Sequence, residues 1–174
     1  YFDNQLNRHV FERAARKCYY PTNNVILEQI DRFKKDTKKF KVTYSISGVF
    51  IEQCEKWNPN LLESFKQLAK TGCVEFLDQT YYHSLSSLYS TARQEFIEQI
   101  RLHRKLMNDL LDYEPKVFEN TECLFNNSIA KTIEGLGYKA IITEGTERIL
   151  NWRSPNHVYK AKGTNLSVLM RNYR

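Results

Sequence analysis

Apolar residues recur at helical spacing near the start of the chain. Residues 6, 10, 11, 14, 15 and 18 follow this spacing, and it resumes after Pro21 at Val25, Ile26, Ile30 and Phe33. Apolar positions three and four residues apart form one face of a helix, and a proline inside such a pattern ends or kinks it. The pattern predicts two opening helices with a break at Pro21.

Three further helical stretches follow. A helix pair is expected around Pro59, a long helix from about Arg93 to Leu111, and a further helix from Ser128 to Leu136. Gly72 and Gly137 stand directly after apolar-periodic segments, where glycine usually ends a helix.

Short β-branched and aromatic runs stand between these helices and favour strands. They predict strands near 42–46, 73–77, 116–120 and 139–143, with a fifth candidate at 166–170. These runs lack an alternating polar face, so we expect neighbouring parallel strands in a buried sheet of an α/β fold. A stretch of a barrel and a stretch of an open doubly wound sheet both fit this pattern.

The composition narrows the classes of function. The chain has 174 residues, 41% of them hydrophobic, and a net charge of +6. Its densest basic run, at 34–41, contains Asp36 and follows a helical segment, which is typical of a solvated helix end. We therefore expect no nucleic-acid partner. No apolar run approaches the ~20 residues that span a bilayer, so a soluble protein without membrane contact is expected.

The sequence contains only weak signals for a bound nucleotide or metal. Residues 135–137 close a helix, whereas a glycine-rich phosphate loop would open one. The histidines lack the spacing of a zinc site. The four cysteines stand far apart without a CxxC pair, which favours reduced thiols in a cytoplasmic protein.

Acidic residues gather at the predicted strand ends, where parallel α/β folds carry their functional groups. They are Glu75, Asp78, Glu119, Glu122 and Glu144. Such carboxylates suit glycoside cleavage, which needs a nucleophile and an acid, or the binding of a hard cation. They are also common in the first turn of a following helix, so spacing alone leaves these interpretations open.

Six short motifs add a more specific signal because they stand in one order along the chain. They are KCYYP at 17–21, SISGV at 45–49, GCVEFL at 72–77, TYYHSL at 80–85, VFENTECLFNN at 117–127 and WRSPN at 152–156. Together they resemble the α-amylase branch of glycoside hydrolase family 57.

The resemblance implies a barrel of seven β/α units, retaining hydrolysis of α-1,4-glucosidic links, and no metal or other cofactor. Residues 1–174 are then a segment of a single catalytic (β/α)7-barrel domain, an incomplete TIM-like barrel. Its first strand is expected before Tyr1 and its last strands beyond Arg174.

The resemblance also implies roles for individual residues. Glu122 matches the nucleophile, and Glu75 matches the glutamate of a Gly-x-x-Glu motif, expected to bind sugar hydroxyls or a neighbouring site residue. We expect both carboxylates to follow their strands into one cavity. The acid/base aspartate is expected outside the segment. Glu119 stands where the family often has arginine, and its charge would raise the pKa of the nucleophile unless the strand's alternation turns it to the opposite face.

Two further residues are candidates for substrate binding. His83 lies in a tyrosine-rich turn, where it either binds a hydroxyl or is structural. Trp152, in a loop with Pro155, is a candidate platform for a sugar ring.

The expected partner is an α-glucan or maltooligosaccharide, and the oligomeric state stays open. The alternatives are a 4-α-glucanotransferase or branching enzyme of the same family, a non-catalytic carbohydrate-binding relative, and a polysaccharide deacetylase.

Overall fold

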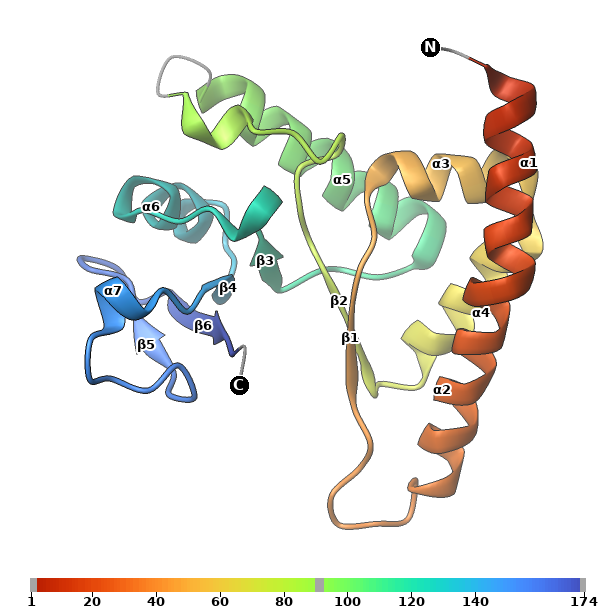
Figure 1. The fold of residues 1–174 in the computed structure, drawn as a ribbon, viewed down its shortest axis with the longest axis horizontal. Helices are drawn as coiled ribbons and strands as arrows, with labels where there is room; N and C mark the ends of the chain where they lie inside the picture. The colour runs from red at the N-terminus through yellow and green to blue at the C-terminus, as the bar shows by residue number, and fades with distance from the viewer. Residues whose placement is uncertain (1–2, 90–92, 173–174) are drawn as a thin grey trace. The chain divides into compact units, whose positions relative to one another are not determined.

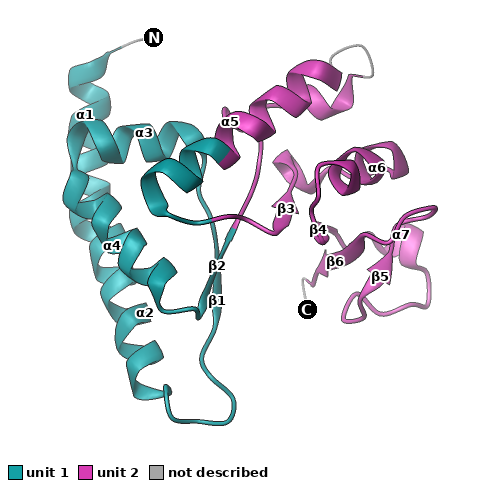
Figure 2. Cartoon of the chain, turned by 180° about the vertical axis from the view of Figure 1, so that it is seen from behind, with its two compact units in different colours: residues 1–76, 105–113 teal, residues 77–104, 114–174 magenta. Residues whose placement is uncertain are grey.

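The computed structural model describes residues 3–89 and 93–172, in which the strands are interspersed with helices along the chain (Figure 1). Two compact units are present, one of residues 1–76 and 105–113 and the other of residues 77–104 and 114–174 (Figure 2). The long helix α5 (Arg93–Leu111) confirms the helix predicted there and contributes to both units. Within the described ranges, no helix has the length and apolar character needed to cross a membrane.

The first unit opens with one continuous helical segment. It consists of α1 (Asn4–Ala14), the π-helical turn η1 (Ala15–Tyr19) and α2 (Tyr20–Arg32). The predicted break at Pro21 is therefore wrong. Proline lacks a backbone N–H and crowds the preceding turn of an α-helix. The wider π turn, in which the Tyr20 N–H donates to the Ala15 carbonyl, allows the helix to continue.

Two strands and the predicted helix pair follow along the chain. In chain order they are β1 (Val42–Ser45), α3 (Gly48–Trp57), α4 (Pro59–Lys70) and β2 (Val74–Leu77). Asn58 ends α3 and caps α4, where its side chain accepts the Leu61 N–H at 3.2 Å. Gly72, with φ of +65°, follows α4. The two strands pair in one sheet.

The core of the first unit carries a buried thiol with an unusual pKa. Cys54 on α3 has no exposed surface and packs in a cluster with Ile51, Leu61 and Phe65. Burial raises the pKa of the Cys54 thiol to about 12. Cys54 and Cys73 are free and buried, as expected, whereas Cys18 is free and exposed.

Cys54 should make the protein less stable at alkaline pH. Its thiol ionises near pH 9 in the unfolded chain but only near 12 in the folded one, so the free energy of unfolding falls as pH rises through this window. We expect Cys54→Ala to reduce the loss of unfolding free energy between about pH 8 and about pH 10.5 in urea titrations. Cys18→Ala is the control, and equal losses in both variants would contradict this cause.

The second unit is built around parallel strands. β3 (Val117–Glu119), β4 (Ala140–Glu144) and β6 (Ser167–Arg171) lie side by side in parallel. Asp78, just after β2, forms a parallel bridge with Phe118 of β3. The strands predicted near 116–120 and 139–143 and the fifth candidate at 166–170 are confirmed, and they are parallel neighbours. The sequence pattern did not predict β5 (Tyr159–Lys160), a two-residue strand antiparallel to β6.

Helices of the second unit pack against this sheet. α6 (Asn127–Gly135) confirms the helix predicted near 128–136, and Gly137, with φ of +91°, follows it. The first half of α5 contributes Phe96 and Ile100 to a core around Phe118. The remaining elements are single turns: η2 (Ser86–Leu88), η3 (Thr121–Cys123) and α7 (Glu147–Leu150).

Candidate active site

Glu122 stands on a strained turn just beyond the end of β3. The 3-10 turn η3 places Glu122 at φ of 55° and ψ of 26°, and Cys123 at φ of 52°. For residues other than glycine this left-handed conformation costs roughly 1–2 kcal/mol each, so two in succession require support from the surrounding structure.

Hydrogen bonds made by the residues around Glu122 supply that support. Asn120 is buried, and its Nδ2 donates to the Ser87 Oγ at 2.8 Å and to the Leu124 carbonyl at 2.9 Å. The Thr121 and Thr80 hydroxyls bond to each other at 2.9 Å. The backbone is fixed, while 74% of the Glu122 side chain remains exposed.

The Cys123 carbonyl connects this turn to the next strand. Thr143 of β4 donates its hydroxyl to that carbonyl at 2.9 Å. Phe118 and Asn120 are buried and Glu119 is only partly so, which agrees with the alternation expected for β3. The Glu119 carboxylate lies 3.8 Å from the Cys123 sulfur.

His83 approaches Glu122 from the segment after β2. The His83 Nε2 is 4.0 Å from the Glu122 Oε1, and its Nδ1 is 3.0 Å from the Gln79 Oε1. An amide oxygen only accepts, so Nδ1 carries the proton of the neutral ring. Nε2 is then an acceptor in neutral His83 and a donor toward the Glu122 carboxylate in the imidazolium.

A buried ionic network anchors the start of the same segment. Asp78 has no exposed surface, and its carboxylate accepts from the His103 Nδ1 at 2.5 Å, from the Tyr138 hydroxyl and from the Gln79 N–H at 2.9 Å. Arg104 lies 3.7 Å from the second carboxylate oxygen. Burial first, and then the Asp78 charge, raise the pKa of Tyr138, so its hydroxyl stays a donor.

Glu75 does not follow its strand as expected. It is the second residue of β2, because the strand extends from Val74 to Leu77. Its Oε1 is buried without a hydrogen-bond partner among the described residues. Glu75 belongs to the first unit and Glu122 to the second, so a cavity shared by both stays a prediction.

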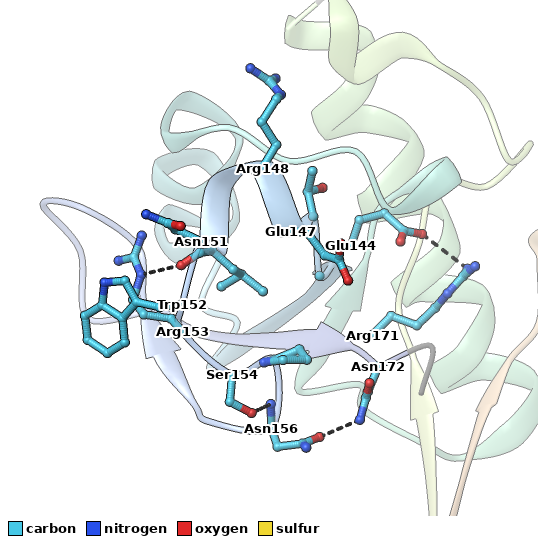
Figure 3. A pocket seen from close by; sticks show the side chains of 14 residues that line it. Glu144, Glu147, Arg148, Asn151, Trp152, Arg153, Ser154, Asn156, Arg171 and Asn172 are labelled. Atoms are coloured by element: carbon cyan, nitrogen blue, oxygen red, sulfur yellow. Dashed lines mark hydrogen bonds and ion pairs between the residues drawn. The ribbon is translucent and has the colours of Figure 1, made fainter.

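Trp152 lies in the unit that carries Glu122. It lines a pocket of about 1020 Å³ at the carboxyl ends of β4 and β6 (Figure 3), and 87% of its surface is exposed. A loop rather than a helix or strand presents it.

A strained, supported carboxylate beyond a parallel strand is suited to nucleophilic chemistry, but many enzyme families place carboxylates there. Comparison of the chain with family profiles is decisive, because the profile of "Glycosyl hydrolase family 57" matches residues 1–174. The chain belongs to this family. The resemblance found in the six motifs is thereby confirmed.

Relatives of this family 57 chain are longer proteins. A protein of Methanocaldococcus jannaschii, provisionally named an α-amylase, is 51% identical over 174 residues, which are all of this chain and 36% of the relative. The α-amylase of Pyrococcus furiosus is 27% identical over 135 residues, 78% of this chain and 19% of that enzyme. The chain thus spans about a third of the length of the first relative and less of the second.

The fold of the family 57 chain also matches a solved structure. The 4-α-glucanotransferase of Thermococcus litoralis aligns with a TM-score of 0.77 at 19% identity, covering 94% of this chain and 25% of that one. At this identity the likeness shows the fold alone.

Two residues that hold the candidate site together were not among the predicted site residues. They are Gln79, which contacts His83, and Thr80, which bonds to Thr121. Both come directly after β2, so the strand-end rule that identified Asp78 was the available signal.

Proposed function

We propose that the protein is a retaining glycoside hydrolase that acts on α-glucans, with Glu122 as its nucleophile. The observation that carries the proposal is the exposed Glu122 carboxylate on a strained, hydrogen-bonded turn after a parallel strand. The family and the α-amylase names of the relatives support the substrate class.

In this mechanism Glu122 attacks the anomeric carbon and forms a glycosyl-enzyme, which water then hydrolyses. The carboxylate must be ionised. The His83 Nε2 faces the Glu122 Oε1 at 4.0 Å, which places the imidazole beside the attacking carboxylate. The partner carboxyl that protonates the leaving oxygen is an aspartate outside residues 1–174.

We further propose that residues 1–174 are part of a single catalytic (β/α)7 barrel. The parallel order of β3, β4 and β6 and the fold likeness to the 4-α-glucanotransferase support this arrangement. Glu75, His83 and Trp152 are the proposed substrate-binding residues. The proposed hydrolysis uses no metal.

The anomeric configuration of the first product tests the proposal. The intact protein should release the α-anomer from maltoheptaose, because two inversions restore the original configuration. Proton NMR spectra taken before mutarotation measure this, and EDTA should leave the rate unchanged. Release of the β-anomer would contradict the mechanism, and products longer than maltoheptaose would reveal glucosyl transfer.

A further inference from the structure

The pocket beside Trp152 lies at the same sheet edge as Glu122. It is bounded by residues 144–148, 150–156 and 171–172, which follow or end β4 and β6. Because β3, β4 and β6 are parallel, their carboxyl ends lie at one edge. The hydrogen bond from Thr143 to the Cys123 carbonyl connects the strand that leads into the pocket with the Glu122 turn.

Contacts between the bounding segments fix the shape of the pocket. Glu144 and Arg171 form an ion pair of 3.3 Å across the ends of β4 and β6, and the Asn172 Nδ2 donates to the Asn156 Oδ1 at 2.8 Å (Figure 3). A Cβ atom at Gly145 would lie 2.6 Å from the Arg171 carbonyl oxygen, so only glycine permits this close approach.

The exposed position of Trp152 is held by its neighbours. The Arg153 guanidinium donates to the Leu150 carbonyl at 3.0 Å and to the Ile149 carbonyl at 2.9 Å, which ties the loop to the end of α7. Asn151 adopts φ of 56° and ψ of −119°, a strained conformation for a residue with a side chain. The indole is therefore presented to solvent by a fixed backbone.

The chemistry of the lining suits a neutral polyhydroxylated ligand. Three arginines line the pocket. Arg171 is paired with Glu144, and Arg153 is engaged with backbone carbonyls. The Arg148 side chain extends away from the other lining side chains (Figure 3), so none of the three guanidinium groups is set up to receive an anion in the pocket. The indole offers a flat apolar surface to the C–H face of a sugar ring. Carboxylate, amide and guanidinium groups around it can bind hydroxyls.

We propose that this pocket is a second sugar-binding subsite, which holds a glucose unit of an α-glucan chain at a distance from the bond that is cleaved. The inference rests on the proposed function, in which Glu122 reacts with the same chain. Its consequence is a dependence on chain length: a long maltooligosaccharide reaches the subsite and a short one does not.

Binding to the intact protein tests the subsite. In the Glu122→Ala background, which prevents turnover, we expect Trp152→Ala to weaken maltoheptaose binding about tenfold and leave maltotriose binding unchanged in calorimetric titrations. Trp152→Phe should retain part of the affinity because it keeps an aromatic ring. Ile149→Ala is the matched control, since Ile149 is 64% exposed on α7 but does not line the pocket.

Three results would overturn the inference. They are equal maltoheptaose affinity in the Trp152→Ala and Ile149→Ala proteins, equal weakening for maltotriose and maltoheptaose, and displacement of maltoheptaose by inorganic phosphate. Failure of the proposed function looks different. Full turnover in the Glu122→Ala protein would show that Glu122 is not the nucleophile. An affinity that depends on Trp152 and on chain length would still support the subsite.

Discussion

The Glu122→Ala protein should lose turnover of amylose by about 10⁴-fold or more while its affinity for maltoheptaose stays within about threefold of the parent. A nucleophile acts mainly in the transition state, so its loss affects the rate far more than ground-state binding. The fold should survive, because 74% of the Glu122 side chain is exposed. Glu119→Ala is the matched control, since this neighbouring carboxylate has no proposed catalytic role.

Azide should restore part of the lost activity. The small anion can occupy the space of the missing carboxylate and attack from the same face, which gives a glycosyl azide of inverted configuration. Loss of a general acid gives a different result, because azide then attacks the glycosyl-enzyme and the product retains the configuration. A retained azide product would therefore move Glu122 to the acid role, and full activity without azide would remove it from the mechanism.

The Asp78→Ala protein should be less stable by about 3–5 kcal/mol, the range seen when one partner of a buried ion pair is removed. The fully buried His103 and the Tyr138 hydroxyl would both lose their acceptor, and Arg104 would lose a nearby counter-charge. Because Asp78 also accepts from the Gln79 N–H, we expect the segment that leads to His83 to loosen. Urea unfolding of the intact protein measures the change.

A milder variant keeps this prediction testable if the Asp78→Ala protein does not fold. Tyr138→Phe removes only one donor to the buried carboxylate and should cost about 1–3 kcal/mol. Tyr159→Phe is the control, because its hydroxyl donates to the Ser154 carbonyl from a partly exposed position. Similar losses in the two phenylalanine variants would contradict a special role for the network.

The parallel sheet could be read from the sequence because its strands are short, apolar and separated by helices. Apolar spacing alone does not distinguish a broken helix from a π turn, and this is why the continuity across Pro21 was missed. The two-residue strand β5 is too short to give a pattern. Its pairing depends on β6, which lies several residues further along the chain.

The candidate site was predictable only in part. Glu122 was found because strand ends and a family motif coincide there, and its contact with His83 became visible only in the fold. The Asp78 network draws its members from the segment after β2, from α5 and from the turn after α6, so no local pattern contains it. Hydrogen bonds between residues far apart in sequence, such as Asn120 and Ser87, cannot be predicted from a local pattern for the same reason.

Trapping the glycosyl-enzyme tests the central claim most directly. A fluorinated α-maltosyl fluoride should form the covalent intermediate quickly and release it slowly, because fluorine destabilises the oxocarbenium-like transition states and a good leaving group speeds the first step. After digestion with a protease, mass spectrometry locates the sugar. We predict that it is attached to Glu122. Attachment to Glu119 or Glu75, or turnover of maltoheptaose without any labelled carboxylate, would contradict the assignment.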